Sequence, residues 1–406
     1  MLKALILRCL ALSWAWDVCS EWLDQRWEKT HALPECVRDI YDAQEYARWQ
    51  RYSAEKKRLR LLSGLVSLAV LAAMFALDGF AALSRLLPQG EYANALTLTL
   101  AWMLISEAID LPFSYWNQMK IEEKYGFNRS TRGTFFLDAL KSLIISAGLL
   151  CGLIAVAIAC RRAWGNAFFL AVYAALALVM LAVSTFTMFF QKLFNKFEPL
   201  PEGALRTRLT DMFTQSGYRL KNIWVMNASK RTTKANAYCA GLGKFKEIVL
   251  YDNLVSGFTE DEIIAVFAHE LTHFKHSDTR RMTALSLLQF LPAVLLLLWI
   301  SSDPACLRQL GFDSLNLGMV FIVLFNALLA PLMTLIQIPM NAFSRMQERR
   351  ADAYPASVGL GEALISALKK LARLNFANLN PHPLNVRLQY SHPPIAERIE
   401  RIRGKR

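Results

Sequence analysis

Long apolar runs alternate with charged segments along this chain of 406 residues. A helix needs about 20 apolar residues to cross a bilayer, and six runs reach that length: about 61–83, 94–114, 136–160, 167–190, 282–301 and 315–340. The first residues, MLKALILRCLALSWAW, are less clear because Arg8 interrupts their apolar run. No small-residue cleavage site follows, so a seventh span or an amphipathic helix is expected there in preference to a signal peptide.

Charged residues flank these spans unequally. Residues 17–60, the long stretch 191–281 and the tail from residue 341 fall on one side of the expected bundle, with most of the Lys and Arg of the short loops. By the positive-inside rule this side is cytoplasmic, and in a bacterium the membrane would be the inner one. Because an even number of spans separates residue 60 from residue 341, the long stretch and the tail share one face.

Composition agrees with a membrane protein and disfavours other classes. Hydrophobic residues make up 54% of the chain and the mean hydropathy is +0.25, which is too apolar for one soluble core of this length. The net charge of +13 then belongs to cytoplasmic loops, so membrane lipid is an expected partner and nucleic acid is not. The seven cysteines show no CxxC spacing, which indicates reduced apolar residues.

The stretch 191–281 is typical of a small α+β domain. ALRTRLTDMFTQSG predicts an amphipathic helix closed by Gly217, and NIWVMNA, KANAYCAGLG and KEIVLYD predict short strands. Thr259 and Glu262 form a capping-box pattern, so the next helix begins near residue 260. The expected organisation is therefore an amino-terminal helical region with a candidate span (1–60), membrane spans (61–190), a cytoplasmic α+β domain (191–281), a two-span hairpin (282–340) and the carboxyl-terminal part of that same domain (341–406).

The helix after residue 260 carries three of the six histidines of the chain, in the stretch AHELTHFKH. His269 and His273 lie about 40° apart and one turn apart on a helix, so both imidazoles can reach one metal ion. His276 lies about 10.5 Å from His269 along the axis and is expected near the ligands or in solvent. Glu270 is placed to deprotonate water without binding the ion. This is the HExxH arrangement of zinc-assisted amide hydrolysis, although such a string also occurs by chance on surface helices.

A catalytic zinc takes three protein ligands and leaves one position open for water. The best candidate for the third ligand is Glu348 in NAFSRMQERRADAYP, because the two-span hairpin returns the chain to the face of the zinc helix. Asp352 follows one turn later and can accept the free N–H of a ligating imidazole. The alternative for Glu348 is an exposed glutamate among arginines.

Several further motifs resemble one known family. They are EWLDQRWEKTHALPECV, IEEKYGFNRST, FNKFEPLPEG, NAYCAGLGKFKEIVLYDNL, SRMQERRAD and YSHPPIAER, and their order and spacing match from about residue 20 to residue 400. The chain resembles the type I CAAX prenyl endopeptidases, which are multi-span zinc metallopeptidases. The short loop at 302–314 favours a bacterial member. The resemblance implies a mainly α fold: a ring of seven helices around a chamber, capped by a small α+β gluzincin-type zinc domain.

The resemblance also implies roles for individual residues. It implies one Zn²⁺ per chain bound by His269, His273 and Glu348, with Glu270 as general base, Asp352 behind a ligand, Asn236 and Tyr238 in a substrate-binding strand, His392 stabilising the oxyanion or holding the substrate, and Arg398 binding a substrate carboxylate. Three of these have structural alternatives: Asn236 as a turn residue, His392 as a packed cap, and Arg398 as one charge of an exposed basic helix.

Three functions remain open from the sequence. The first is cleavage of membrane-associated peptides or proteins, prenylated C-termini among them. The second is general quality-control proteolysis of membrane proteins by the same mechanism. The third is a zinc-binding membrane protein or transporter without enzymatic activity, and Glu270 argues against it because a structural site has no use for a base beside its ligand. The expected function is therefore that of a polytopic membrane zinc endopeptidase.

Overall fold

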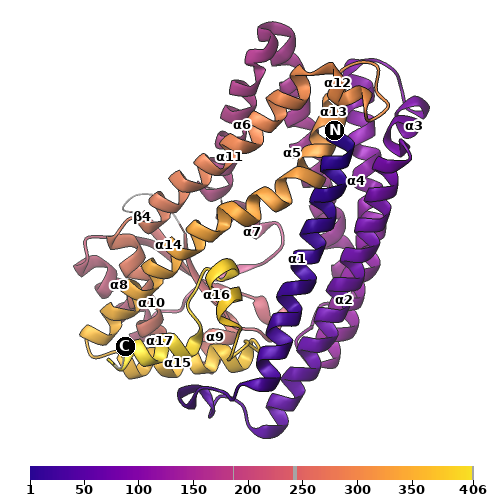
Figure 1. Ribbon diagram of the computed structural model, residues 1–406. Helices are drawn as coiled ribbons and strands as arrows, with labels where there is room; N and C mark the ends of the chain where they lie inside the picture. The colour runs from indigo at the N-terminus through magenta and orange to yellow at the C-terminus, as the bar shows by residue number, and fades with distance from the viewer. Residues whose placement is uncertain (186, 241–244, 405–406) are drawn as a thin grey trace.

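The computed structural model describes residues 1–185, 187–240 and 245–404. It combines a bundle of long helices with a smaller part that contains the sheet (Figure 1). The helices of the bundle are α1 (Leu2–Thr30), α2 (Ala43–Ala76), α3 (Gly79–Leu86), α4 (Glu91–Trp116), α5 (Arg132–Trp164), α6 (Phe168–Thr185), α7 (Thr187–Lys192), α11 (Asp278–Ser302), α12 (Pro304–Arg308), α13 (Leu317–Val323) and α14 (Leu329–Ser357). Two π-helical turns, η2 (Asn117–Glu122) and η5 (Leu324–Leu328), adjoin α4 and α14.

Five helical stretches among the described residues are long and apolar enough to cross a membrane: Ala43–Ala76, Glu91–Glu122, Arg132–Thr185, Asp278–Ser302 and Leu317–Ser357. The sequence predicts six or seven spans, which is more than these five stretches. The stretch Arg132–Thr185 contains two of the expected spans, α5 and α6, joined at Gly165–Ala167 and packed against each other. The helix α1 is not among the five because Lys3, Arg8 and Asp17 interrupt its apolar half.

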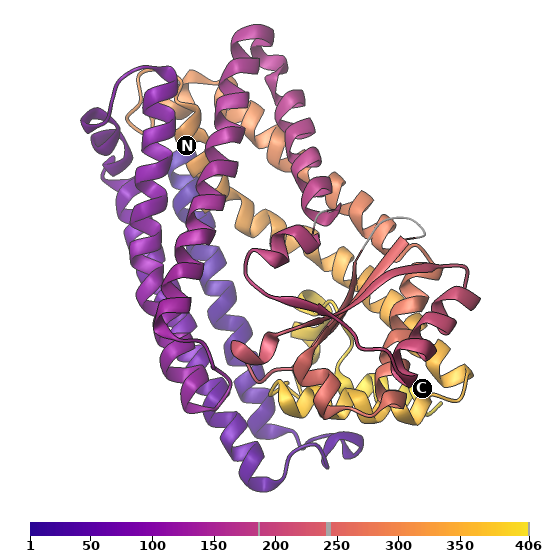
Figure 2. The same ribbon diagram turned by 180° about the vertical axis from the view of Figure 1, so that it is seen from behind.

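The smaller part is built on a four-stranded sheet with the order β1-β2-β4-β3 (Figure 2). Its strands are β1 (Phe197–Pro199), β2 (Arg219–Met226), β3 (Ala237–Ala240) and β4 (Phe245–Tyr251). The three strands and the helix α8 (Ala204–Gln215) expected from the sequence are therefore confirmed, although the end of the expected strand after residue 240 lies outside the described residues. Among the described strands, β3 lies at the edge and pairs antiparallel with β4.

The helix α10 (Glu260–Lys275) packs on this sheet and begins where the capping box predicts, because the Thr259 hydroxyl accepts from the Glu262 N–H and the Glu262 carboxylate accepts from the Thr259 N–H. Its buried Phe267 and Leu271 belong to the same apolar core as Ile248 of β4. Burial of each such side chain stabilises the fold by about 1.5–3 kcal/mol. The helix is therefore rigidly placed against the sheet.

The carboxyl-terminal helices α15 (Gly361–Leu374), α16 (Pro383–Gln389) and α17 (Ile395–Ile402) return to α10 and α14. The helix α14 runs obliquely from the end of the bundle where the amino terminus lies to the part with the sheet (Figure 1). It packs against α10, α16 and α17 in that part. The helix α14 thus extends from the membrane bundle to the region of the histidine cluster.

Candidate metal centre

Within the described residues, one group of side chains is arranged to hold a metal ion: His269 and His273 on α10, and Glu348 on α14. The two Nε2 atoms are 3.2 Å apart, and each lies 3.4 Å from a different oxygen of Glu348. Ligands bound about 2.0–2.2 Å from a tetrahedral zinc ion are about 3.3–3.6 Å apart. The buried Oε2 atom of Glu348 has no hydrogen bond within the described chain. The donor set and its spacing therefore fit a zinc ion.

Each histidine presents its Nε2 to this group because a carboxylate binds its other nitrogen. The Nδ1 atom of His269 lies 3.0 Å from Asp352, one helical turn after Glu348 on α14. The Nδ1 atom of His273 lies 2.9 Å from Asp278, the first residue of α11. Such partners fix the tautomer and the ring orientation of a ligating histidine. Both imidazoles are thus preoriented toward Glu348.

These carboxylates also change the electrostatics of the imidazoles. Burial by itself lowers the pKa of His269, but hydrogen bonds to Asp352 and Glu348 outweigh it and raise the pKa to about 9. For His273, burial again lowers the pKa, whereas Glu348 and Asp278 raise it overall. The site therefore attracts positive charge strongly, as a cation-binding centre requires.

Arg398 lies behind the metal group. Its guanidinium is buried and donates from Nε and Nη2 to the two oxygens of Asp352, at 2.9 and 2.7 Å. Burial lowers its pKa, but the charges of Asp352, Glu348 and Glu270 raise it overall. The sequence-based role of Arg398 as partner of a substrate carboxylate stays a prediction. In the structure, the guanidinium holds the carboxylate that orients His269.

The remaining expected site residues lie around the group at different depths. His392 is 61% exposed and its Nε2 is 3.3 Å from Glu348, so the structure brings it to the open side of the group. Glu270 follows His269 on α10 and is half-buried. Asn236 is exposed just before β3, and its carbonyl accepts from the Tyr251 N–H. Tyr238 lies on β3 with its hydroxyl buried and without a partner in the described chain, and burial raises its pKa to about 12.

Some contributors were missed from the sequence. Asp278 lies beyond the end of α10, and it reaches His273 because Ser277 adopts a left-handed conformation with φ of 54°. In the sequence, an acidic residue five positions after the second histidine is only a weak indication of such a contact. Ser391 contacts Nδ1 of His392 at 2.9 Å. The third histidine, His276, is exposed at the end of α10, which matches the expectation that it lies in solvent and not the alternative that it lies beside the ligands.

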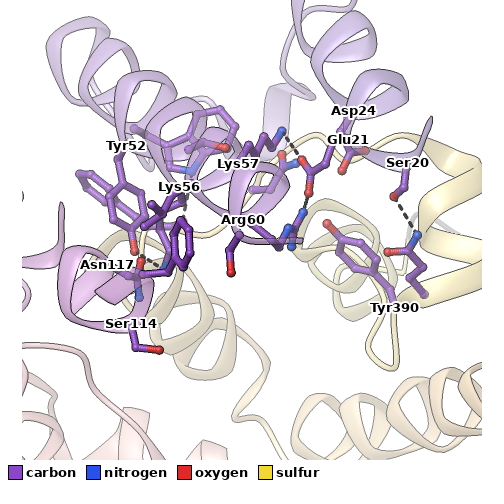
Figure 3. Close-up of a pocket in the computed structure, with 18 residues that line it drawn as sticks. Ser20, Glu21, Asp24, Tyr52, Lys56, Lys57, Arg60, Ser114, Asn117 and Tyr390 are labelled. Carbon is purple, nitrogen blue, oxygen red and sulfur yellow. Dashed lines mark hydrogen bonds and ion pairs between the residues drawn. The ribbon is translucent and has the colours of Figure 1, made fainter. Parts of the chain in front are cut away.

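A cavity of about 550 Å³ lies beside the segment that leads to His392. Figure 3 shows its lining from α1, α2, η2 and the carboxyl-terminal segment, with Tyr390 facing the charged residues of α1 and α2. Ion pairs link the walls, because Lys57 bridges Glu21 and Glu28 at 3.6 and 3.3 Å. One residue, Ser391, separates Tyr390 in this lining from His392 beside the metal group.

Comparison with known proteins gives matches along almost the whole chain. Residues 23–196 match the family model of the CAAX prenyl protease N-terminal region, described as five membrane helices, and residues 199–406 match that of peptidase family M48. CAAX prenyl protease 1 homolog of Arabidopsis thaliana is 31% identical over 93% of this chain and 92% of its own length. CAAX prenyl protease 1 of Saccharomyces cerevisiae is 29% identical over 90% and 87%.

The fold agrees with these matches. A crystal structure of Ste24p from S. mikatae superposes with a TM-score of 0.91 and 27% sequence identity, covering 99% of both chains. The family resemblance and the mainly helical membrane architecture expected from the motifs are therefore confirmed. Since the peptidase match covers residues 199–406 and the relatives match along nearly the full length, this multi-pass membrane metalloendopeptidase belongs to peptidase family M48.

Proposed function

We propose that this protein is a zinc endopeptidase whose ion is held by His269, His273 and Glu348. The observation that carries the proposal is the spacing of the three ligand atoms, 3.2–3.4 Å, with a carboxylate on the far nitrogen of each imidazole. Two neutral histidines and one carboxylate are a usual ligand set of a catalytic zinc, which keeps one position open. A structural site would be closed by a fourth protein ligand.

In such a site a zinc ion supplies Lewis-acid polarisation of a carbonyl and acidifies water. Glu270 takes a proton from the attacking water and returns it to the leaving amine. Ser391 Oγ lies 2.9 Å from Nδ1 of His392, and we propose that this hydroxyl donates to Nδ1, which leaves the imidazole proton on Nε2. That N–H faces the metal group from its open side and can donate to the oxyanion of the tetrahedral species.

The peptide is held by backbone pairing. The strand β3 is an edge strand of the described sheet, and an extended peptide can add to such an edge. Asn236 and Tyr238 belong to this edge and are the proposed substrate contacts. The cavity in Figure 3 offers room for the part of the substrate beyond the scissile bond, because it adjoins the segment before His392. We also propose that the first part of the peptidase domain extends from residue 191 to residue 281, and that the metal site faces the cytoplasm.

For the substrate we propose a prenylated carboxyl terminus, because the similar proteins from plants and yeast are CAAX prenyl proteases. The second candidate, quality-control cleavage of membrane proteins in general, uses the same chemistry. The test is cleavage, in detergent, of one peptide ending in a CaaX sequence, with and without its farnesyl group. Glu270→Gln protein, which should bind zinc but lose turnover, is the blank.

The outcomes separate the proposals. Cleavage that requires the farnesyl group supports a prenyl-processing enzyme, and equal cleavage of both peptides favours the general peptidase. Full activity of Glu270→Gln would refute the role of that carboxylate.

A further inference from the structure

A buried arginine on α14 binds backbone instead of a carboxylate. The guanidinium of Arg345, which is 7% exposed, donates to the carbonyl of Tyr390 at 2.5 Å and to that of Arg387 at 3.1 Å. Among the described residues no carboxylate lies within ion-pair distance of it. Burying a charge without a counter-ion is costly. A lysine or leucine could fill the same volume, so packing alone does not explain this residue.

The partners of Arg345 all belong to the segment that ends in His392. One turn earlier on α14, the buried Asn341 donates to the carbonyl of Leu388 at 3.1 Å. Three carbonyls of the segment 387–390 are thus fixed by two adjacent side chains of one helix. Residues at positions i, i+4, i+7 and i+11 share a helix face, and Asn341, Arg345, Glu348 and Asp352 have this spacing. The face that carries the third metal ligand therefore also carries the anchors of the His392 segment.

The segment is held from its other sides as well. The side chains of Asn385 and Gln389 donate to the backbone carbonyl and the hydroxyl of Ser20 on α1, at 2.8 and 2.7 Å. Figure 3 shows the second of these bonds at the rim of the cavity. After His392, two prolines lead into α17, whose Arg398 is bound to Asp352. Among the hydrogen bonds of the described residues, the one from Arg345 to the Tyr390 carbonyl is the bond that reaches the backbone of residues 390–392, and the Ser391 hydroxyl contacts the ring of His392.

We propose that Arg345 is a positioning residue for His392: it fixes the 387–390 backbone so that the exposed imidazole stays over the metal group. This inference rests on the proposed function of His392, and it deepens it by naming what holds that side chain. Within the described chain, Arg345 makes no hydrogen bond or ion pair with a metal ligand, so it acts through the segment. A displacement of a catalytic group by about 1 Å can reduce turnover about 100-fold.

The test is a double-mutant cycle with Arg345→Met and His392→Ala in the full-length protein. We expect Arg345→Met to lower kcat about 10- to 100-fold, with zinc content and KM nearly unchanged. If Arg345 acts through His392, the double variant has the kcat of His392→Ala alone, because residues that act as a unit are not additive. Losses of kcat that multiply in the double variant would overturn the proposal, and so would loss of zinc from Arg345→Met.

Hydrogen exchange of the 387–392 amides gives a readout without substrate. Exchange should quicken in Arg345→Met, and unchanged exchange would overturn the proposal even if activity falls. Quicker exchange in a protein whose parent cleaves neither peptide would support the anchoring and refute the proposed function separately. Asn341→Ala removes one of the three bonds and serves if Arg345→Met does not fold, with a smaller effect of the same kind expected. Arg373→Met is the matched control, because Arg373 makes two bonds to Glu45 at the surface.

Discussion

Replacement of Asp278 by asparagine probes the carboxylate that the sequence did not reveal. Asp278 is 3% exposed, lies 2.9 Å from Nδ1 of His273, and also pairs with Arg350. Asparagine has nearly the same shape and can still accept a hydrogen bond from Nδ1. The substitution therefore removes the negative charge behind the imidazole and leaves the packing almost unchanged.

The expected loss of zinc affinity can be bounded. Removing such a partner of a ligating histidine typically weakens metal binding about 10- to 100-fold, which corresponds to about 1.4–2.7 kcal/mol. Asp278 is almost completely buried, so solvent screens its charge little and the upper half of this range is expected. The partner Arg350 is 32% exposed and can be hydrated, so its loss of a counter-ion adds a smaller cost.

The assay is zinc affinity, measured on purified protein by competition with a chelator of known affinity. Asp303→Asn is the matched control, because Asp303 follows the opposite end of α11 and its side chain accepts from Ala305 N–H. A zinc affinity of Asp278→Asn within about twofold of the parent would refute the argument that this carboxylate strengthens the site. Equal weakening in both variants would trace the effect to α11 as a whole.

Three further substitutions test other parts of the structure. Glu348→Ala should lose zinc with the helices intact, and unchanged metal content by mass spectrometry would remove Glu348 from the ligand set. Gly318→Ala should lower stability in detergent by about 1–3 kcal/mol, because the added Cβ would lie 2.3 Å from the Ala95 carbonyl oxygen; an unchanged melting temperature would contradict this close packing of α13 on α4. Burial raises the pKa of Glu262, but hydrogen bonds from Lys370 and other donors lower it overall, to below the ordinary value of 4.5. The ionised carboxylate therefore stabilises the fold at pH values above 4.5. The stability difference between the parent and Glu262→Gln should therefore shrink as the pH falls below 4.5, and a constant difference would exclude this linkage.

The sequence was most informative where a contact depends on one helix. His269 and His273 follow from the i, i+4 spacing, and the start of their helix follows from Thr259 and Glu262, since neither inference requires knowledge of the tertiary fold. Glu348 required one further step, the return of the chain through a hairpin. These are local or topological arguments, and the structure agrees with the geometry that they imply.

Contacts between distant segments could not be inferred in this way. The basic helix near Arg398 suggested exposure, but α17 packs on α14 and α15 and buries that guanidinium against Asp352. Asp278 required the left-handed backbone at Ser277, a position where neither glycine nor asparagine indicates such a conformation. Arg345 is one of several arginines in SRMQERRAD, and only the fold distinguishes the one that meets Tyr390 from those that reach other partners. The expected count of six or seven spans exceeds the five apolar stretches by one or two, because α5 and α6 fall within one stretch and α1 is not among the five.

Because α14 carries Glu348, a metal ion bound at this group would link two segments that lie far apart in the sequence. His273 and Glu348 are the ends of a long loop of chain that passes through α11 to α14 and includes two of the membrane-crossing stretches. An ion shared by these residues acts as a reversible cross-link that closes the loop, and closing a long loop restricts the unfolded chain. Chelation should therefore loosen not only the peptidase part but also the membrane hairpin. The stability of the membrane hairpin would then depend on metal supply, although the metal ligands lie outside the expected spans 282–301 and 315–340.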